Sequence, residues 1–203
     1  MSVGLFLGIR AAYSPEDAEK YLAAIATALA SEELPPYDEP WDVDAAEKKY
    51  NELRGQARTK LDVLGGAVQP LARTIVRARG QAGAGPFRDL SLTTERIFVP
   101  GDFLQRIEVP GAPSRSIWST GALITALRSA ALTLGLPLVG GEVPPAMLPK
   151  IDKGRKLSKN DPVSPDEDEF NFTMLGHYRP AWLALAEYAR VAHANQIALA
   201  LAG

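Results

Sequence analysis

The apolar positions at the two ends of the chain have the pattern of buried β-strands. Residues 3–9 (VGLFLGI) form a continuous apolar run that ends at Arg10, which is typical of a strand covered on both faces. We therefore expect this strand in the middle of a sheet. Residues 196–202 (QIALALA) follow Asn195, a residue suited to stopping a helix, and we expect a final strand there beside the first one. The alternative is that they form the tail of the preceding helix.

Apolar residues spaced by three and four predict helices over most of the remaining chain. The first helix begins after Ser14, which can cap its free N–H groups, with a proline in the first turn. Ser119 or Thr120 caps a later helix that Gly135 closes. The predicted helical segments are 15–33, 43–64, 67–79, 122–134 and 179–194.

The remaining residues are expected to form short strands and one long loop. Residues 95–102 (ERIFVPGD) and 104–109 (LQRIEV) predict a hairpin or a bulged pair of strands. Residues 136–139 predict a brief strand, and the proline-rich, charged segment 143–171 predicts a long surface loop that is partly mobile. The sequence thus predicts a single globular domain over residues 1–203 of the α+β class. A small central sheet, containing the N-terminal and C-terminal strands, is covered by three to four helices.

Composition narrows the possible chemistry. The 203 residues are 46% hydrophobic and 23% charged, which is ordinary for a folded domain. With no cysteine and two histidines, most zinc, haem, iron–sulfur, thiol and serine–histidine sites are poor expectations, and we expect neither a metal nor a cofactor. The opening apolar run is too short for a signal peptide or a membrane span. We therefore expect a cytoplasmic protein, which the absence of cysteine fits.

An acidic and aromatic loop, PPYDEPWD, follows the first helix, and its prolines exclude regular structure. Aromatic anchors ringed by carboxylates suit recognition of a basic partner, because the rings supply contact area and the charges steer the approach. The alternative is that the two rings fold back onto the core and hold the loop between two helices. The candidate interaction residues are Tyr37, Asp38, Glu39, Trp41 and Asp42.

Basic residues predominate over residues 44–79, after an acidic excess over residues 1–42. One interpretation is a basic helical face that binds nucleic acid. The formal net charge of −2 and the lack of the aromatic–basic interleaving that stacks bases argue against this interpretation, and solvated faces with occasional ion pairs are the simpler one. The candidate residues of this face are Lys48, Lys49, Arg54, Arg58, Arg73 and Arg77.

Carboxylates near predicted strand ends suggest an enzyme as an alternative. Asp102, Glu108 and Glu142 lie at such positions, where catalytic residues often gather. If folding brought them into one pocket, they could perform hydrolase chemistry by acid and base catalysis.

Four segments resemble a group of uncharacterised bacterial proteins of unknown function. They are LPPYDEP (34–40), FVPGDF (98–103), ALITALRSAALTLGLPL (122–138) and WLALAEYARVAHANQIALALA (182–202). The resemblance implies a bacterial origin and a shared fold with a C-terminal strand. It implies no catalytic residue, and LSLTTERI stands here where the group has a segment with cysteine, histidine and aspartate.

The features together predict a non-catalytic protein that binds another protein. One concrete version is an immunity-type inhibitor that covers the surface of a basic toxin with the acidic and aromatic loop. A hydrolase built on gathered carboxylates is the second hypothesis, and a nucleic-acid-associated protein is the third.

Overall fold

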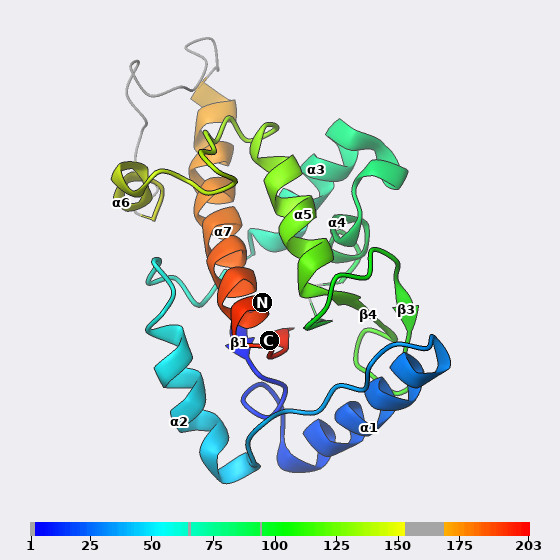
Figure 1. Ribbon diagram of the computed structural model, residues 1–203. Coiled ribbons are helices and arrows are strands. Elements are labelled where there is room, and N and C mark those ends of the chain that lie inside the picture. The colour runs from blue at the N-terminus through cyan, green and yellow to red at the C-terminus, as the bar shows by residue number, and fades with distance from the viewer. Residues whose placement is uncertain (1–2, 65, 94, 153–168) are drawn as a thin grey trace.

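A mixed sheet runs through the centre of the fold (Figure 1). The computed structural model describes residues 3–64, 66–93, 95–152 and 169–203. In this part of the chain five strands pair in the order β1-β5-β2-β4-β3, with β2 parallel to β4 and the other pairs antiparallel. The strands are β1 (Gly4–Leu7), β2 (Arg96–Val99), β3 (Ile107–Glu108), β4 (Ser116–Ser119) and β5 (Leu199–Ala202).

Helices cover both faces of this sheet. α1 lies alone along one side in Figure 1, while α3, α5 and α7 stack on the other. The helices of the described residues are α1 (Pro15–Ser31), α2 (Val43–Arg54), α3 (Val68–Gly83), α4 (Pro86–Leu90), α5 (Thr120–Ala131), α6 (Leu148–Asp152) and α7 (Glu169–Ala194), with a short 3-10 turn at Pro145–Met147. The architecture confirms the predicted α+β class.

Alternate residues of each central strand enter two separate cores. In β2, Ile97 and Val99 pack toward α1, whereas Phe98 packs into the larger core beneath α3, α5 and α7. In β4, Ile117 and Trp118 divide in the same way. This is the two-residue period of a pleated strand buried on both faces. The sheet is therefore the middle layer of three.

The C-terminal strand lies beside the first strand, as the sequence predicts, but the first strand does not lie in the middle of the sheet as expected. β5 is internal, with β1 on one side and β2 on the other, and β1 is an edge strand. The outer edge of β1 is covered by an extended segment, where Leu5 N–H donates to Asp62 O at 2.8 Å and Leu64 N–H to Val3 O at 2.8 Å. Because this segment covers the outer edge of β1, an edge strand here can have the continuous apolar sequence that is typical of a central strand.

The expected helix over residues 43–64 is too long, because α2 ends at Arg54. The residues after it leave the helix to cover β1, so a tertiary contact overrides the helical spacing of Ala57, Leu61 and Leu64. The expected hairpin of residues 95–102 and 104–109 is also wrong. β2 and β3 do not pair, and β4, a strand without a strong sequence signal, lies between them.

The segment expected to be one long loop, residues 143–171, contains helical structure. α6 places Leu148 and Ile151 in the larger core, and α7 begins at Glu169. Residues 153–168 lie outside the described part. None of the helices in the described ranges combines the length and apolar character that a membrane crossing requires.

Ser119 joins the end of β4 to the start of α5, as the predicted cap. Its hydroxyl accepts from Ala122 N–H at 2.9 Å and donates to Phe103 O at 2.6 Å, inside the protein. We expect Ser119→Ala to lower the free energy of unfolding by about 1–2 kcal/mol, because one cap and one buried acceptor are lost. Urea denaturation measures this. Ser31→Ala on the exposed end of α1 is the matched control, and an equal effect of the two substitutions would contradict the assignment.

Candidate functional site

A cleft of about 460 Å³ lies where the parallel strands β2 and β4 end. Its wall is formed by three parts of the chain that are distant in sequence: the end of α1 with the segment after it, the turn after β2, and Gln196 in the connection from α7 to β5. The carboxyl ends of parallel strands are a frequent place for ligand sites. The lining residues are Leu29, Leu34, Pro35, Pro36, Tyr37, Asp38, Pro100, Gly101, Asp102, Phe103 and Gln196.

The turn after β2 is held against the first turn of α5. Gly121 N–H donates to Gly101 O at 3.0 Å, and a Cβ at Gly121 would collide with that oxygen and with the Asp102 carboxylate. A glycine at this position therefore allows the turn to lie directly on the helix. The Asp102 carboxylate consequently lies beside the first turn of α5.

The charged residues among the described lining are both carboxylates, Asp38 and Asp102. The Asp38 side chain is 76% exposed, and its contact with Arg10 is long, at 3.4 Å. Phe103 and the prolines supply apolar surface between the two acids. The cleft therefore presents negative charge over an apolar floor, which suits a cationic group with an alkyl stem.

The acidic and aromatic loop forms one wall of this cleft, but most of it folds back onto the core. Tyr37 is 7% exposed and Glu39 is 5% exposed. The Tyr37 hydroxyl accepts from Ala198 N–H at 2.7 Å, and the Glu39 carboxylate accepts from the N–H groups of Ile9 and Arg10. The expectation that Tyr37 and Glu39 form an exposed surface is wrong, because each satisfies buried backbone donors.

The other loop residues divide between structure and surface. Trp41 is half-buried against the larger core, and the Asp42 carboxylate caps α2 by accepting from Ala45 N–H at 2.9 Å. Arg10 holds the loop from inside, donating to Trp41 O at 2.7 Å. Two of the five loop candidates, Asp38 and Asp42, are exposed carboxylates, and Asp42 caps α2. Asp38 therefore remains as the exposed carboxylate of this loop that caps no helix.

Two buried glutamates have pKa values shifted in opposite directions. Burial raises the pKa of Glu39 above 4.5, and its hydrogen bonds from Ile9 and Arg10 only partly offset this. Burial acts on Glu187 in the same sense, but hydrogen bonds from Arg58 and Arg190 outweigh it and hold its pKa below 4.5. Glu187 is 2% exposed, and Arg58 Nη2 lies 2.6 Å from its Oε1.

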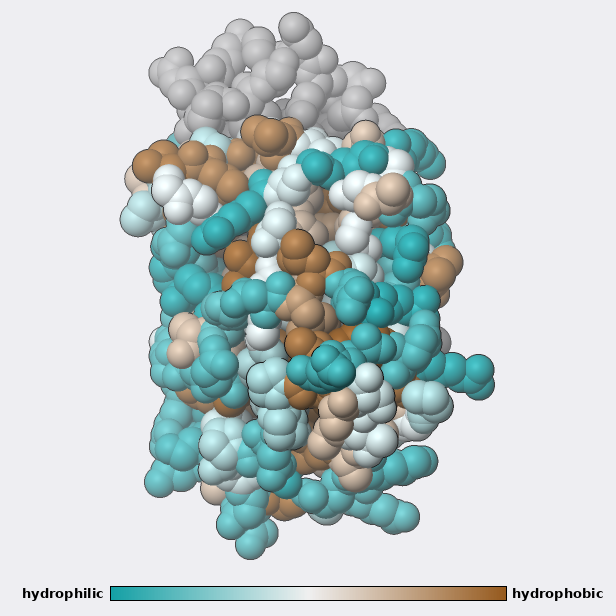
Figure 2. Space-filling model, turned by 45° about the vertical axis from the view of Figure 1, so that its right-hand side comes forward, coloured by the Kyte–Doolittle hydropathy of each residue, from teal (hydrophilic) through white to brown (hydrophobic). Residues whose placement is uncertain are grey.

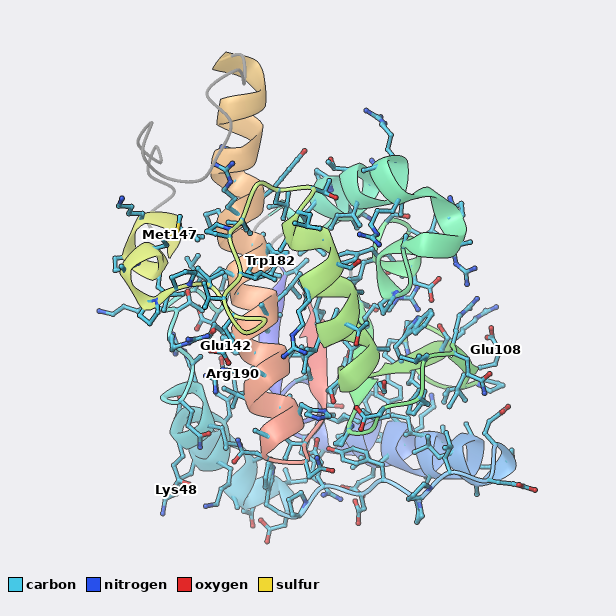
Figure 3. All side chains as sticks on the ribbon, turned by 45° about the horizontal axis from the view of Figure 1, so that its top comes forward. Lys48, Glu108, Glu142, Met147, Trp182 and Arg190 are labelled. Atoms are coloured by element: carbon cyan, nitrogen blue, oxygen red, sulfur yellow. The ribbon has the colours of Figure 1, made fainter. Side chains whose placement is uncertain are left out.

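The three carboxylates of the hydrolase hypothesis lie in different places. Asp102 lines the cleft, Glu108 pairs with Arg106 at 3.0 Å, and Glu142 pairs with Arg58 at 3.0 Å. Figure 3 shows Glu108 beyond α5, far from Glu142 beside α7. The expectation that these acids gather at one site is therefore wrong, since the turn after β2, strand β3 and the turn near Gly141 supply them separately.

The basic residues do not form one face either. Lys48, Lys49 and Arg54 belong to α2, whereas Arg73 and Arg77 belong to α3, and the two helices lie at opposite sides of the fold in Figures 1 and 3. Several of their charges are paired, as in Arg54 with Asp62 at 2.6 Å and Lys49 with Glu52 at 2.7 Å. Arg58 is committed to Glu187 and Glu142.

Exposed apolar residues are scattered. Figure 2 shows hydrophobic surface on one face as an interrupted strip between hydrophilic side chains rather than as one broad patch. This face therefore lacks the broad apolar patch that a flat protein–protein interface uses. Among the described residues, no three His, Asp or Glu side chains gather as a metal site requires.

No protein-family model, curated protein or solved structure matches the chain. The resemblance to uncharacterised bacterial proteins stays a prediction. The sequence indicated Asp38 and Asp102 separately, and their common cleft was missed because only the tertiary fold brings residues 35–38 to the turn after β2.

Tyr37 offers a test of the folded-back loop. We expect Tyr37→Phe to lower the free energy of unfolding by about 1–3 kcal/mol, because Ala198 N–H loses its buried acceptor. Tyr21→Phe is the control, since the Tyr21 ring packs edge-on against Tyr13 and its hydroxyl has no hydrogen bond in the described residues. Equal stability of the Tyr37→Phe variant and the unmodified protein in urea denaturation would disprove this role.

The two glutamates predict opposite dependences on pH. The contribution of Glu39 to stability is fully present below its unfolded pKa near 4.5 and falls as pH rises through its raised folded pKa. The contribution of Glu187 is present above 4.5 and is lost as pH falls through its lowered folded pKa. The stability cost of Glu39→Gln should therefore shrink with rising pH, and that of Glu187→Gln should shrink with falling pH. Urea denaturation of both variants across about pH 3.5 to 7.5 measures these slopes, and parallel slopes would contradict the assignment.

Proposed function

We propose that the protein is a non-catalytic binding protein whose cleft, lined by Asp38 and Asp102, receives a basic side chain of a partner protein. The observation that carries this proposal is the charge of the cleft, whose charged lining residues in the described part of the chain are two carboxylates. A lysine or arginine would place its alkyl stem on Phe103 and the neighbouring prolines and its charge between the acids.

The two carboxylates in this cleft favour selective and rapid association with a basic partner. Exposed carboxylates steer a basic surface toward the cleft and disfavour acidic partners. The pair also needs no rearrangement, since Asp102 is held at the start of α5 and Asp38 by its own loop, where its carboxylate accepts from Glu39 N–H at 2.8 Å. An immunity-type inhibitor of a basic partner in the cytoplasm belongs to this class, with Asp38 and Asp102 in place of the whole acidic loop.

The two other hypotheses have less support. A hydrolase on Asp102, Glu108 and Glu142 would need those groups in one pocket, and they lie apart. A nucleic-acid-binding surface would need its basic residues side by side, and they belong to separate helices.

The proposal predicts loss of one partner when both cleft acids are neutralised. We expect Asp38→Asn with Asp102→Asn to lower recovery of a stoichiometric partner from lysate at least about tenfold, as the loss of charge-assisted contacts implies. The control is Asp44→Asn with Glu47→Gln, two exposed acids of α2 that change the net charge equally. Quantitative mass spectrometry of tagged-protein captures measures recovery, and thermal unfolding verifies the fold. Equal loss in both variants would mean general charge steering, and an empty capture with the unmodified protein would contradict a stable partner.

A further inference from the structure

A second pocket, of about 210 Å³, lies between α5, α7 and the turn near Gly141. It shares no lining residue with the acidic cleft. Trp182, Glu142 and Arg190 all belong to the lining: Trp182 and Arg190 come from α7, and Glu142 lies beside this helix in Figure 3. The described lining residues are Arg58, Ile124, Leu127, Arg128, Gly141, Glu142, Val143, Trp182, Leu183, Ala186, Glu187, Arg190, His193 and Ala194.

The walls of this pocket include apolar, closely packed side chains from two helices. Ile124 and Leu127 come from α5, and the Trp182 ring from α7 is fixed by its hydrogen bond from Nε1 to Leu127 O at 2.8 Å. Leu127 and Trp182 are nearly inaccessible to solvent. A preformed apolar hollow with a few polar groups at its rim is the usual form of a small-molecule site, and this volume, below the roughly 300–1,000 Å³ of drug-sized sites, suits a compact ligand.

The charged rim has an excess of one positive charge. Three arginines and two glutamates line the pocket. Glu187 forms ion pairs with Arg58 and with Arg190, whose Nη2 lies 3.0 Å from Glu187 Oε2. Glu142 also forms an ion pair with Arg58. Arg128 has neither a carboxylate nor a hydrogen-bond acceptor among the described residues.

Gly141 makes room for the Arg128 guanidinium. A Cβ at Gly141 would lie 2.9 Å from Arg128 Nε, and the backbone there has a φ of +84°, which disfavours any other residue. The guanidinium therefore lies against bare backbone at the rim. Arg190, on the opposite helix, also has a buried Nε without an acceptor in this part of the chain.

We propose that this pocket binds a small organic anion with an apolar, planar body and one carboxylate. The body fills the hollow beside Trp182, and the carboxylate receives the planar fork of Arg128. A cationic ligand is disfavoured because the remaining charges of the rim are already paired. The site is independent of the cleft proposed to bind a partner protein.

Three naphthalene probes with one body and different charges test this proposal. Isothermal titration calorimetry on the full chain compares naphthalene-2-carboxylate, the neutral naphthalene-2-carboxamide and the cationic naphthalen-2-ylmethylammonium. We expect the carboxylate to bind at least about tenfold more tightly than the ammonium, as a charge-assisted hydrogen bond implies. Arg128→Gln should weaken the carboxylate about tenfold and change the amide by less than about twofold.

Matched variants separate the pocket from the general charge of the protein. Arg77→Gln removes an equally exposed arginine of α3 outside the pocket and should leave all three affinities unchanged. Ala186→Phe fills the hollow and should abolish binding of the carboxylate and the amide, with circular dichroism verifying the fold. Equal binding of carboxylate and ammonium, an unchanged affinity in Arg128→Gln, or no binding of any probe at millimolar concentration would overturn the proposal.

Discussion

β5 joins the two halves of the sheet, and most of the fold depends on its insertion. One edge of the strand pairs with β1 and the other with β2, so residues from the start, middle and end of the chain meet on it. Its core residues have no solvent exposure, and the small side chains of Ala198 and Ala200 let the layer under α1 approach closely. Without β5 the sheet would be divided, since β1 and β2 each pair with β5 and not with one another. The loop after α1 depends on the same strand, since Tyr37 binds Ala198 N–H while Ala198 O binds Gly8 N–H.

Signals that are local in sequence were predicted well, and those that depend on distant partners were not. The caps at Ser14 and Ser119 and the terminal strands follow from a few neighbouring residues, and the structure has all of them. β4 was missed because its ends are serines, and their buried hydroxyls have partners from outside the strand, as where Arg96 donates to Ser116 Oγ at 2.8 Å and Ser119 donates to Phe103 O at 2.6 Å. The edge position of β1 was missed for a similar reason, because the segment that covers its outer edge has the apolar spacing of a helix.

The candidate site illustrates the same limit. The sequence indicated that the loop after α1 has functional chemistry, and also that its rings could fold back, but it could not divide the residues between the two roles. That division depends on which donors lie nearby, because a carboxylate beside free backbone N–H groups becomes structural and one facing solvent does not. Glu39 lies beside the turn after β1, where Gly8 (φ +111°) leaves room for it, and Asp38 points out of the same loop.

A formal net charge of −2 conceals a strong local separation of charge. Asp89, 3% exposed, is surrounded by arginines, with Arg106 Nε at 3.3 Å, and Glu187 is held between Arg58 and Arg190. Burying such ions costs desolvation free energy, and their close pairing offsets that cost and fixes how the helices sit. Charges used in this way are unavailable to a ligand. The local charge differs from place to place, because two carboxylates line the cleft where β2 ends and three arginines against two glutamates line the pocket beside Gly141. One nearly neutral sequence thus has two hollows of opposite local charge.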